Sequence, residues 1–153
     1  MKRLRVYVAG AYSADNVMDV LANMRKGMRV GTQLLHLGFA PFVPWLDHHL
    51  VFMLQGDESF AVEDFYEYSL SWLRVSDVML VVPGWTESKG TLKEIEVAEA
   101  LSIPVYYSLA QMVRHIIDDF NFNENQGEDH NEDQEEYASH IKNKLDSIGE
   151  LDW

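Results

Sequence analysis

The stretch DVMLVVPGWTESKGTLKEIEVAEAL, residues 77–101, leads from an apolar run into a helical one through a loop that contains two glycines. The apolar run, 77–82, has the length of a buried strand. The second run, 91–101, has helical spacing and is predicted to turn Ile95 and Ala98 toward a sheet. A buried strand, a loop and a helix in this order form the repeating unit of an α/β fold.

The same alternation continues on both sides of this stretch. A helix from 17 to 37 is predicted to begin after Ser13 or Asp15 and to end at Gly38. Because each strand is apolar throughout, we expect a parallel sheet covered on both faces, in a flavodoxin-like or Rossmann-like three-layer α/β sandwich of four to five strands. The other predicted elements are strands at 4–9, 39–43 and 105–107, a helix at 109–117, and a helix at 61–75 with Phe65, Leu70, Trp72 and Leu73 as its core.

The formal net charge of −13 is concentrated near the C-terminus, where residues 118–153 carry 12 acidic and 2 basic side chains. We therefore divide the chain into an α/β domain at 1–117, an acidic and flexible linker at 118–136, and a short C-terminal helix at 137–153. We expect this helix to dock on the domain or on a neighbouring subunit. A separate partner-binding peptide is the alternative.

The composition excludes several classes of protein. The chain has no cysteine, which rules out disulfides and thiolate sites and is typical of a cytoplasmic protein. It shows no basic stripe for a nucleic acid polymer, no run of roughly 18 apolar residues for a membrane, and no signal peptide. Asp47, His48 and His49 are adjacent, which is poor spacing for metal ligands. Neither a metal nor another cofactor is predicted.

Ligands of such folds bind beyond the carboxyl ends of the strands, and three loops lie there: 10–16, 44–49 and 84–90. In the last of these, Ser88, Gly90 and Thr91 stand where a helix begins. Its free backbone N–H groups would stabilise an anion such as a phosphate. The alternative is that Ser88 or Thr91 only caps the helix. The spacing of a P-loop is absent.

Glu94 lies one turn into this helix, and its side chain is expected to lean back toward the loop. Glu96 points to another side of the helix, so only one of the two can face a ligand. A carboxylate beside a pocket can attack or stabilise an electrophilic sugar carbon. The alternative role for Glu94 is a favourable acid in the first turn of a helix.

Three motifs in order resemble one family: VYVAG at 6–10, SDVMLVVPGW at 76–85, and S-x-G-x-x-x-E at 88–94. They are similar to the nucleoside 2-deoxyribosyltransferase-like superfamily, which includes deoxyribosyltransferases and 2′-deoxynucleoside 5′-monophosphate N-glycosidases. The PGW-x-x-S-x-G form is closest to small bacterial and phage members. The resemblance spans about residues 5–107. It implies a small nucleoside or nucleotide as substrate and a homodimer or larger homo-oligomer.

The resemblance makes Glu94 the nucleophile that attacks C1′ of the deoxyribose, and Tyr7 the residue that orients its carboxylate. From the residues alone, Tyr7 could equally be a core aromatic with a satisfied hydroxyl. Ser88 and the Gly90 backbone match groups that hold the sugar 5′ end or its phosphate. The other expected substrate-binding residues are Gly10, Tyr12 and Trp85.

One position departs from the family. The nucleotide hydrolases carry an aspartate where this chain has Ser69, and a serine cannot protonate a departing base as an acid of suitable pKa would. Asp47 is our candidate for that catalytic role, with His48 and Asp64 as alternatives. Asp77 matches an aspartate that usually starts its strand and is interpreted as structural.

Two other functions stay open. A nucleotide-binding module or regulator without turnover is favoured by Ser69. A phosphoribohydrolase of the lysine-decarboxylase-like group is the minor alternative, because Gly90, Thr91 and Glu94 reproduce its G-T-x-x-E motif. That group, however, carries PGG where this chain has PGW. The base, and the choice between hydrolysis and transfer, are left open by the sequence.

Overall fold

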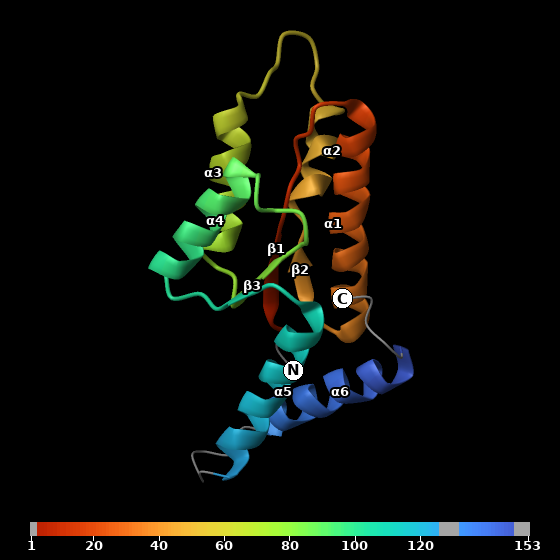
Figure 1. Ribbon diagram of the computed structural model, residues 1–153, viewed down its shortest axis with the longest axis vertical. Coiled ribbons are helices and arrows are strands. Elements are labelled where there is room, and N and C mark those ends of the chain that lie inside the picture. The colour runs from red at the N-terminus through yellow and green to blue at the C-terminus, as the bar shows by residue number, and fades with distance from the viewer. Residues whose placement is uncertain (1–2, 126–131, 149–153) are drawn as a thin grey trace.

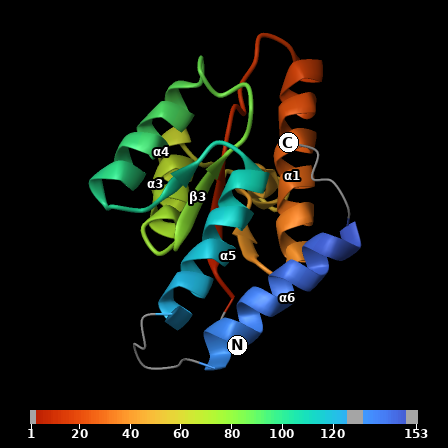
Figure 2. The ribbon, with the colours of Figure 1, turned by 60° about the horizontal axis from the view of Figure 1, so that its bottom comes forward.

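A computed structural model describes residues 3–125 and 132–148 and contains a parallel sheet with the strand order β2-β1-β3-β4 within those residues. Helices cover both faces of this sheet (Figures 1 and 2). The predicted three-layer α/β sandwich of flavodoxin-like type is therefore confirmed. The strands are β1 (Arg5–Ala9), β2 (Ala40–Phe42), β3 (Val78–Val81) and β4 (Val105–Tyr106).

Alternate residues of the strands belong to two separate cores, as the period of two in a strand requires. Val6 and Val8 face α1 (Val17–Leu37), α5 (Leu109–Asn125) and α6 (Glu132–Ile148). Tyr7 and Ala9 face α3 (Val62–Leu73) and α4 (Lys89–Ala100), where Ile95 and Ala98 are buried as predicted. One face of β1 therefore points toward the side of the sheet that carries Glu94.

Helix α1 is built to let the chain after β2 approach closely. It begins at Asn16, whose side-chain oxygen accepts from the Asp19 amide at 3.0 Å. The cap is thus Asn16 and not Ser13 or Asp15, because Asn16 directly precedes the first helical residue. A Cβ atom at Gly27 would clash with the ring of Trp45, so this glycine allows the turn η1 (Pro44–Asp47) to pack on the helix.

Helix α3 differs from the prediction at one core position. Leu70 and Leu73 are buried and Phe65 is half-buried, but Trp72 is 47% exposed. Its ring stacks on Phe42 of β2, with the ring centroids 5.4 Å apart. Phe42 belongs to the edge strand β2 and is itself only half-buried.

The C-terminal segment is more helical than predicted. Helix α5 continues through Asn125 and α6 begins at Glu132, so helix replaces both ends of the predicted linker at 118–136. No glycine or proline interrupts α5 before Gly127, which explains its length. Residues 126–131 of that linker and 149–153 of the predicted helix lie outside the described residues.

Helix α6 packs against α5 and α1 and buries Tyr137 and Ile141. The Tyr137 hydroxyl accepts from the amide of Leu4 at 3.0 Å and donates to the carbonyl of Gly38 at 3.3 Å. It ties α6 to the first strand and to the end of α1, on the side of the sheet away from the predicted ligand loops. None of the described helices is both long and apolar enough to cross a bilayer.

Candidate active site

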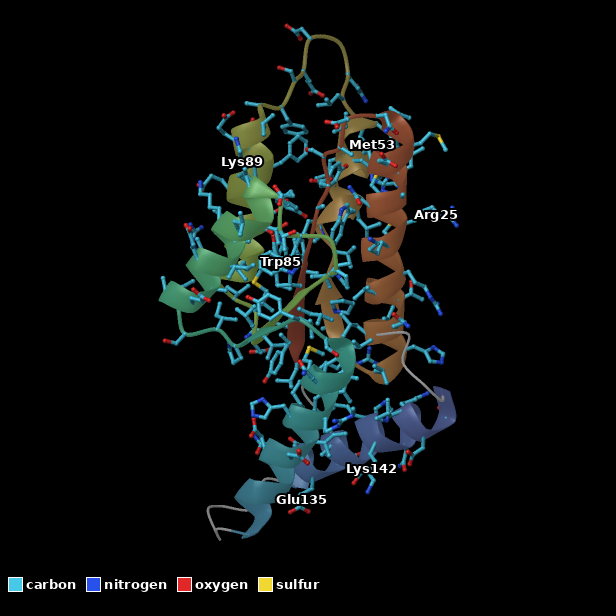
Figure 3. The ribbon with its side chains drawn as sticks, in the orientation of Figure 1. Arg25, Met53, Trp85, Lys89, Glu135 and Lys142 are labelled. Carbon is cyan, nitrogen blue, oxygen red and sulfur yellow. The ribbon has the colours of Figure 1, made fainter. Side chains whose placement is uncertain are left out.

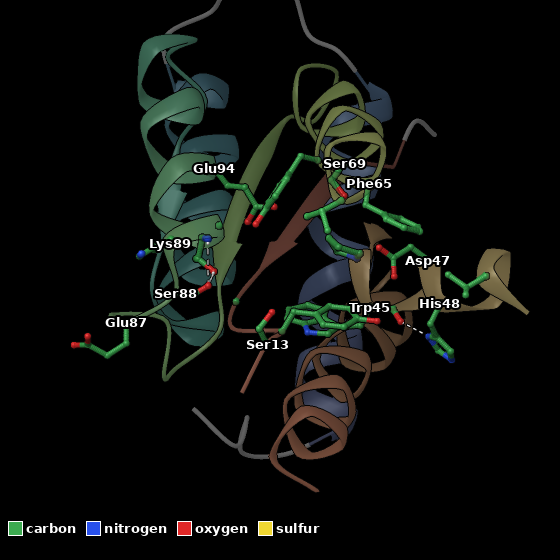
Figure 4. A pocket seen from close by; sticks show the side chains of 18 residues that line it. Ser13, Trp45, Asp47, His48, Phe65, Ser69, Glu87, Ser88, Lys89 and Glu94 are labelled. Atoms are coloured by element: carbon green, nitrogen blue, oxygen red, sulfur yellow. Dashed lines mark hydrogen bonds between the residues drawn. The ribbon is translucent and has the colours of Figure 1, made fainter. Parts of the chain in front are cut away.

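A cavity of about 590 Å³ lies at the carboxyl ends of the strands. Its size is within the usual range for small-molecule sites. All three predicted loops contribute to it, and α3 supplies a further wall (Figure 4). The lining residues are Gly10, Tyr12, Ser13, Pro44, Trp45, Asp47, His48, Val51, Val62, Phe65, Tyr66, Ser69, Glu87, Ser88, Lys89, Gly90, Thr91 and Glu94.

At the base of this cavity, the hydroxyl of Tyr7 donates to Oε1 of Glu94 at 2.6 Å. Tyr7 lies on β1 and is fully buried, and its ring stacks on Phe42 with centroids 5.5 Å apart. Glu94 reaches the same point from the second turn of α4, and its carboxylate faces the cavity. A strand and a helix thus hold the two groups together, although they are 87 residues apart in the chain.

Burial raises the pKa of Glu94 from its ordinary value of 4.5 to about 7, and the hydrogen bond from Tyr7 opposes this rise. Burial, followed by the negative charge of Glu94, raises the pKa of Tyr7 well above 10. Tyr7 therefore stays a hydrogen-bond donor at physiological pH. Glu94 exchanges between its acid and carboxylate forms near neutrality, as a group that acts in catalysis would.

The N-terminus of α4 forms another wall of the cavity. Ser88 is its cap, and Oγ accepts from the amide of Thr91 at 3.4 Å and from its hydroxyl at 2.9 Å. Ser88 therefore caps α4, as the alternative interpretation of the sequence predicted. Its hydroxyl accepts both of these hydrogen bonds, so its proton is still available for donation to a ligand. Gly90 admits the ring of Tyr66, to which a Cβ atom would come within 3.3 Å.

The opposite wall carries Asp47, Tyr12 and His48. Burial raises the pKa of Asp47, opposed by the charge and backbone of His48 and by a hydrogen bond from the Tyr12 hydroxyl. Burial and Asp47 in turn raise the pKa of Tyr12. His48 donates from Nδ1 to the carbonyl oxygen of Trp45, which fixes the orientation of its ring.

Of the eight residues predicted for the site, six line the cavity: Gly10, Tyr12, Asp47, Ser88, Gly90 and Glu94. Tyr7 reaches the site through Glu94. Trp85 does not line the cavity; it packs on Tyr107 with ring centroids 5.3 Å apart, and Figure 3 shows it on the loop after β3.

The family's aspartate is replaced by Ser69 in this chain, and the structure gives Ser69, Asp64 and Asp77 different surroundings. Ser69 is only 6% exposed, lines the cavity and hydrogen-bonds to Tyr7. Asp64 accepts from the amide of Ala61 at 2.7 Å and so caps α3. The carboxylate of Asp77 accepts hydrogen bonds from the backbone amide of Arg5 at 2.7 Å and from the Arg5 guanidinium. These contacts agree with a structural role for Asp77.

The wall that α3 contributes to the cavity was not predicted from the sequence. Val62, Phe65, Tyr66 and Ser69 all line the cavity. They occupy positions i, i+3, i+4 and i+7 of the helix and therefore share one face. This spacing was visible in the sequence, but the same stripe also reads as a core face. In the described part of the chain, no group of three or more His, Asp or Glu residues could hold a metal.

Among solved structures, the chain is similar to a 2-deoxyribosyltransferase from the psychrotolerant bacterium Bacillus psychrosaccharolyticus. The TM-score is 0.48 and the identity 17%, over 66% of this chain and 69% of that one. No curated protein matches the sequence. A family model described as a domain of unknown function, DUF1937, matches residues 4–109, a range that contains all four strands and every residue of the cavity. The chain therefore belongs to the DUF1937 family.

Proposed function

We propose that this protein cleaves or transfers the N-glycosidic bond of a 2′-deoxynucleoside or its 5′-monophosphate, with Glu94 as the nucleophile. The observation that carries the proposal is the Tyr7–Glu94 pair, joined at 2.6 Å and directed into a cavity at the carboxyl ends of the strands. A half-buried carboxylate with a fixed orientation and a pKa of about 7 is a stronger nucleophile than a fully solvated one.

In the first step, a carboxylate oxygen of Glu94 attacks C1′ and forms a glycosyl ester, while the C1′–N bond breaks and its electron pair goes to the base. In the second step, water or another base attacks C1′ and releases Glu94. Tyr7 holds Oε1, which leaves Oε2 to attack. Since Tyr7 does not line the cavity, it acts through Glu94 as a positioning residue.

The walls of the cavity suit the two halves of such a substrate. Val62, Phe65 and Tyr66 offer apolar and aromatic surface to a base. The N-terminus of α4 offers Ser88 and backbone N–H groups to the 5′ end of the sugar or its phosphate. The sugar would then lie between them, next to Glu94.

The test is a panel of 2′-deoxynucleosides and their 5′-monophosphates, with release of base followed by chromatography, with and without a second base as acceptor. Wild type and the Glu96→Gln variant should release base, and Glu94→Gln should not. Glu96 is the matched control because it is exposed on the same helix and does not line the cavity. If Glu94→Gln retains the rate of Glu96→Gln, the proposal is wrong.

A nucleotide-binding module without turnover is the second candidate, because Ser69 stands where the nucleotide hydrolases carry an aspartate. Calorimetry on the same compounds separates the two functions. Binding of a monophosphate without release of base from any member of the panel would favour the module. Including ribonucleoside 5′-monophosphates in the panel also tests the phosphoribohydrolase alternative.

A further inference from the structure

We propose that Asp47 donates the proton that allows the base to leave, from the wall of the cavity opposite Glu94. The inference rests on the proposed function, because it concerns the leaving group of the same reaction. The turn η1 holds Asp47 at the cavity, and Figure 4 shows the carboxylates of Asp47 and Glu94 directed toward it from opposite sides.

The reaction needs such a donor, since a base that departs as an anion is a poor leaving group. Proton donation by a positioned side chain typically contributes about 10²–10⁴-fold to the rate. In O-glycosidases that retain configuration, the two carboxyl groups lie about 5–5.5 Å apart, because the protonated oxygen is bonded to the sugar carbon. A nucleobase accepts its proton on a ring nitrogen or carbonyl oxygen remote from the sugar. The donor can therefore lie across the cavity, beside the base.

Several other polar groups of the cavity are poor donors. The Ser69 hydroxyl is too weak an acid, as are tyrosine hydroxyls. The Nδ1 proton of His48 is used by the Trp45 carbonyl, so its other nitrogen carries a proton only when the ring is charged. Glu87 is exposed and stands beside Ser88, on the wall that holds Glu94. Asp64 lies outside the cavity lining and caps α3.

Asp47 has the environment that a donor requires. It is half-buried, and burial raises its pKa, which keeps more of the carboxyl group protonated than in water. Tyr12 lies close enough to Asp47 to oppose the rise of its pKa, and so it stabilises the carboxylate once the proton has gone. His48 also favours the charged form, so the carboxyl group gives up its proton readily when the base departs.

The transfer balances within the two-step reaction. As the C1′–N bond breaks, its electron pair is drawn into the base, and the base takes the proton of Asp47 and leaves neutral. Asp47 is then a carboxylate. When water attacks C1′ of the glycosyl ester, Glu94 leaves as a carboxylate and the deoxyribose is released. The proton of the attacking water returns to Asp47 through water that enters the space left by the base, so Asp47 is again a carboxylic acid.

The test compares two substrates that differ only in how far the base needs a proton. 2′-Deoxyguanosine needs one, whereas 7-methyl-2′-deoxyguanosine already carries a positive charge and releases a neutral base. Both are used as nucleosides and as 5′-monophosphates. Asp47→Asn should lower kcat/KM about 10²–10⁴-fold on the ordinary member of a pair and less than about tenfold on the activated member.

The controls separate this inference from the proposed function. Glu94→Gln should lose its activity on both members of each pair. Asp57→Asn is the same change as Asp47→Asn on an exposed residue outside the cavity, and it should keep its activity on both. Equal losses by Asp47→Asn on both members would overturn the inference. So would His48→Gln, if that variant showed the selective loss and Asp47→Asn did not. A wild-type protein that releases no base from any of these compounds would contradict the proposed function itself.

Discussion

Replacing Glu94 by glutamine should stabilise the protein at alkaline pH, in addition to removing its activity. The folded protein raises the pKa of Glu94 from 4.5 to about 7, so between these values the folded state binds more protons than the unfolded state. The free energy of unfolding of the wild type therefore falls as pH rises through this window. The full penalty is about 3 kcal/mol above pH 7 and vanishes below pH 4.5.

Glutamine has no charge to bury, and its side-chain oxygen can still accept from Tyr7. The difference in stability between Glu94→Gln and wild type should therefore grow by about 2 kcal/mol between pH 5.5 and pH 8.5. For a protein of this size, that corresponds to about 4–8 °C in Tm.

Urea unfolding of the two proteins at these two pH values measures the change. The lower value is kept above the isoelectric point of about 4.7, where solubility is lowest. Glu96→Gln should leave the difference constant, because that side chain is exposed. A difference for Glu94→Gln that does not change with pH, or that favours the wild type at pH 8.5, would refute the burial of this carboxylate.

Tyr7→Phe removes the hydrogen bond that lowers the pKa of Glu94, so the acid limb of the pH profile of kcat/KM should move to higher pH; an unshifted limb would contradict the pairing. Ser88→Ala should lower kcat/KM for 5′-monophosphates about ten- to a hundredfold more than for nucleosides, as expected for one charge-assisted hydrogen bond of roughly 1.5–3 kcal/mol. Equal losses on the two kinds of substrate would show that the loop binds a hydroxyl of the sugar and not a phosphate. Gly27→Ala should cost about 1–3 kcal/mol in urea unfolding, because its methyl group overlaps the Trp45 ring. Deleting residues 132–153 should lower the urea midpoint, because α6 buries Tyr137 and Ile141; an unchanged midpoint would show that α6 does not stabilise the domain.

Much of the fold could be predicted from the sequence because its strands and helices have different periods. The apolar run at 77–82 and the spacing of Ile95 and Ala98 indicated a strand and a helix. The same helical geometry placed Glu94 toward the loop, and the structure directs its carboxylate into the cavity. These features depend on neighbouring residues in the chain, which a sequence displays directly.

The other features depend on contacts between distant residues. Trp85 lies in a loop, where no periodic pattern indicates the direction of its side chain. It packs on Tyr107 because β4 lies beside β3. The acidic residues after Ile117 indicated a linker, although charge alone does not end a helix and α5 continues. The contact of Tyr137 with Leu4 joins the two ends of the chain, which no local pattern could predict.

The most direct test of the central claim is the rate of base release by Glu94→Ala in the presence and absence of sodium azide. We predict that the folded variant releases almost no base from a 2′-deoxynucleoside or its monophosphate. Azide, which can enter the space left by the side chain, should restore release and yield a deoxyribosyl azide. Glu96→Ala should match the wild type and show no response to azide. A folded Glu94→Ala variant that releases base as fast as Glu96→Ala without azide would contradict the assignment of Glu94 as the nucleophile.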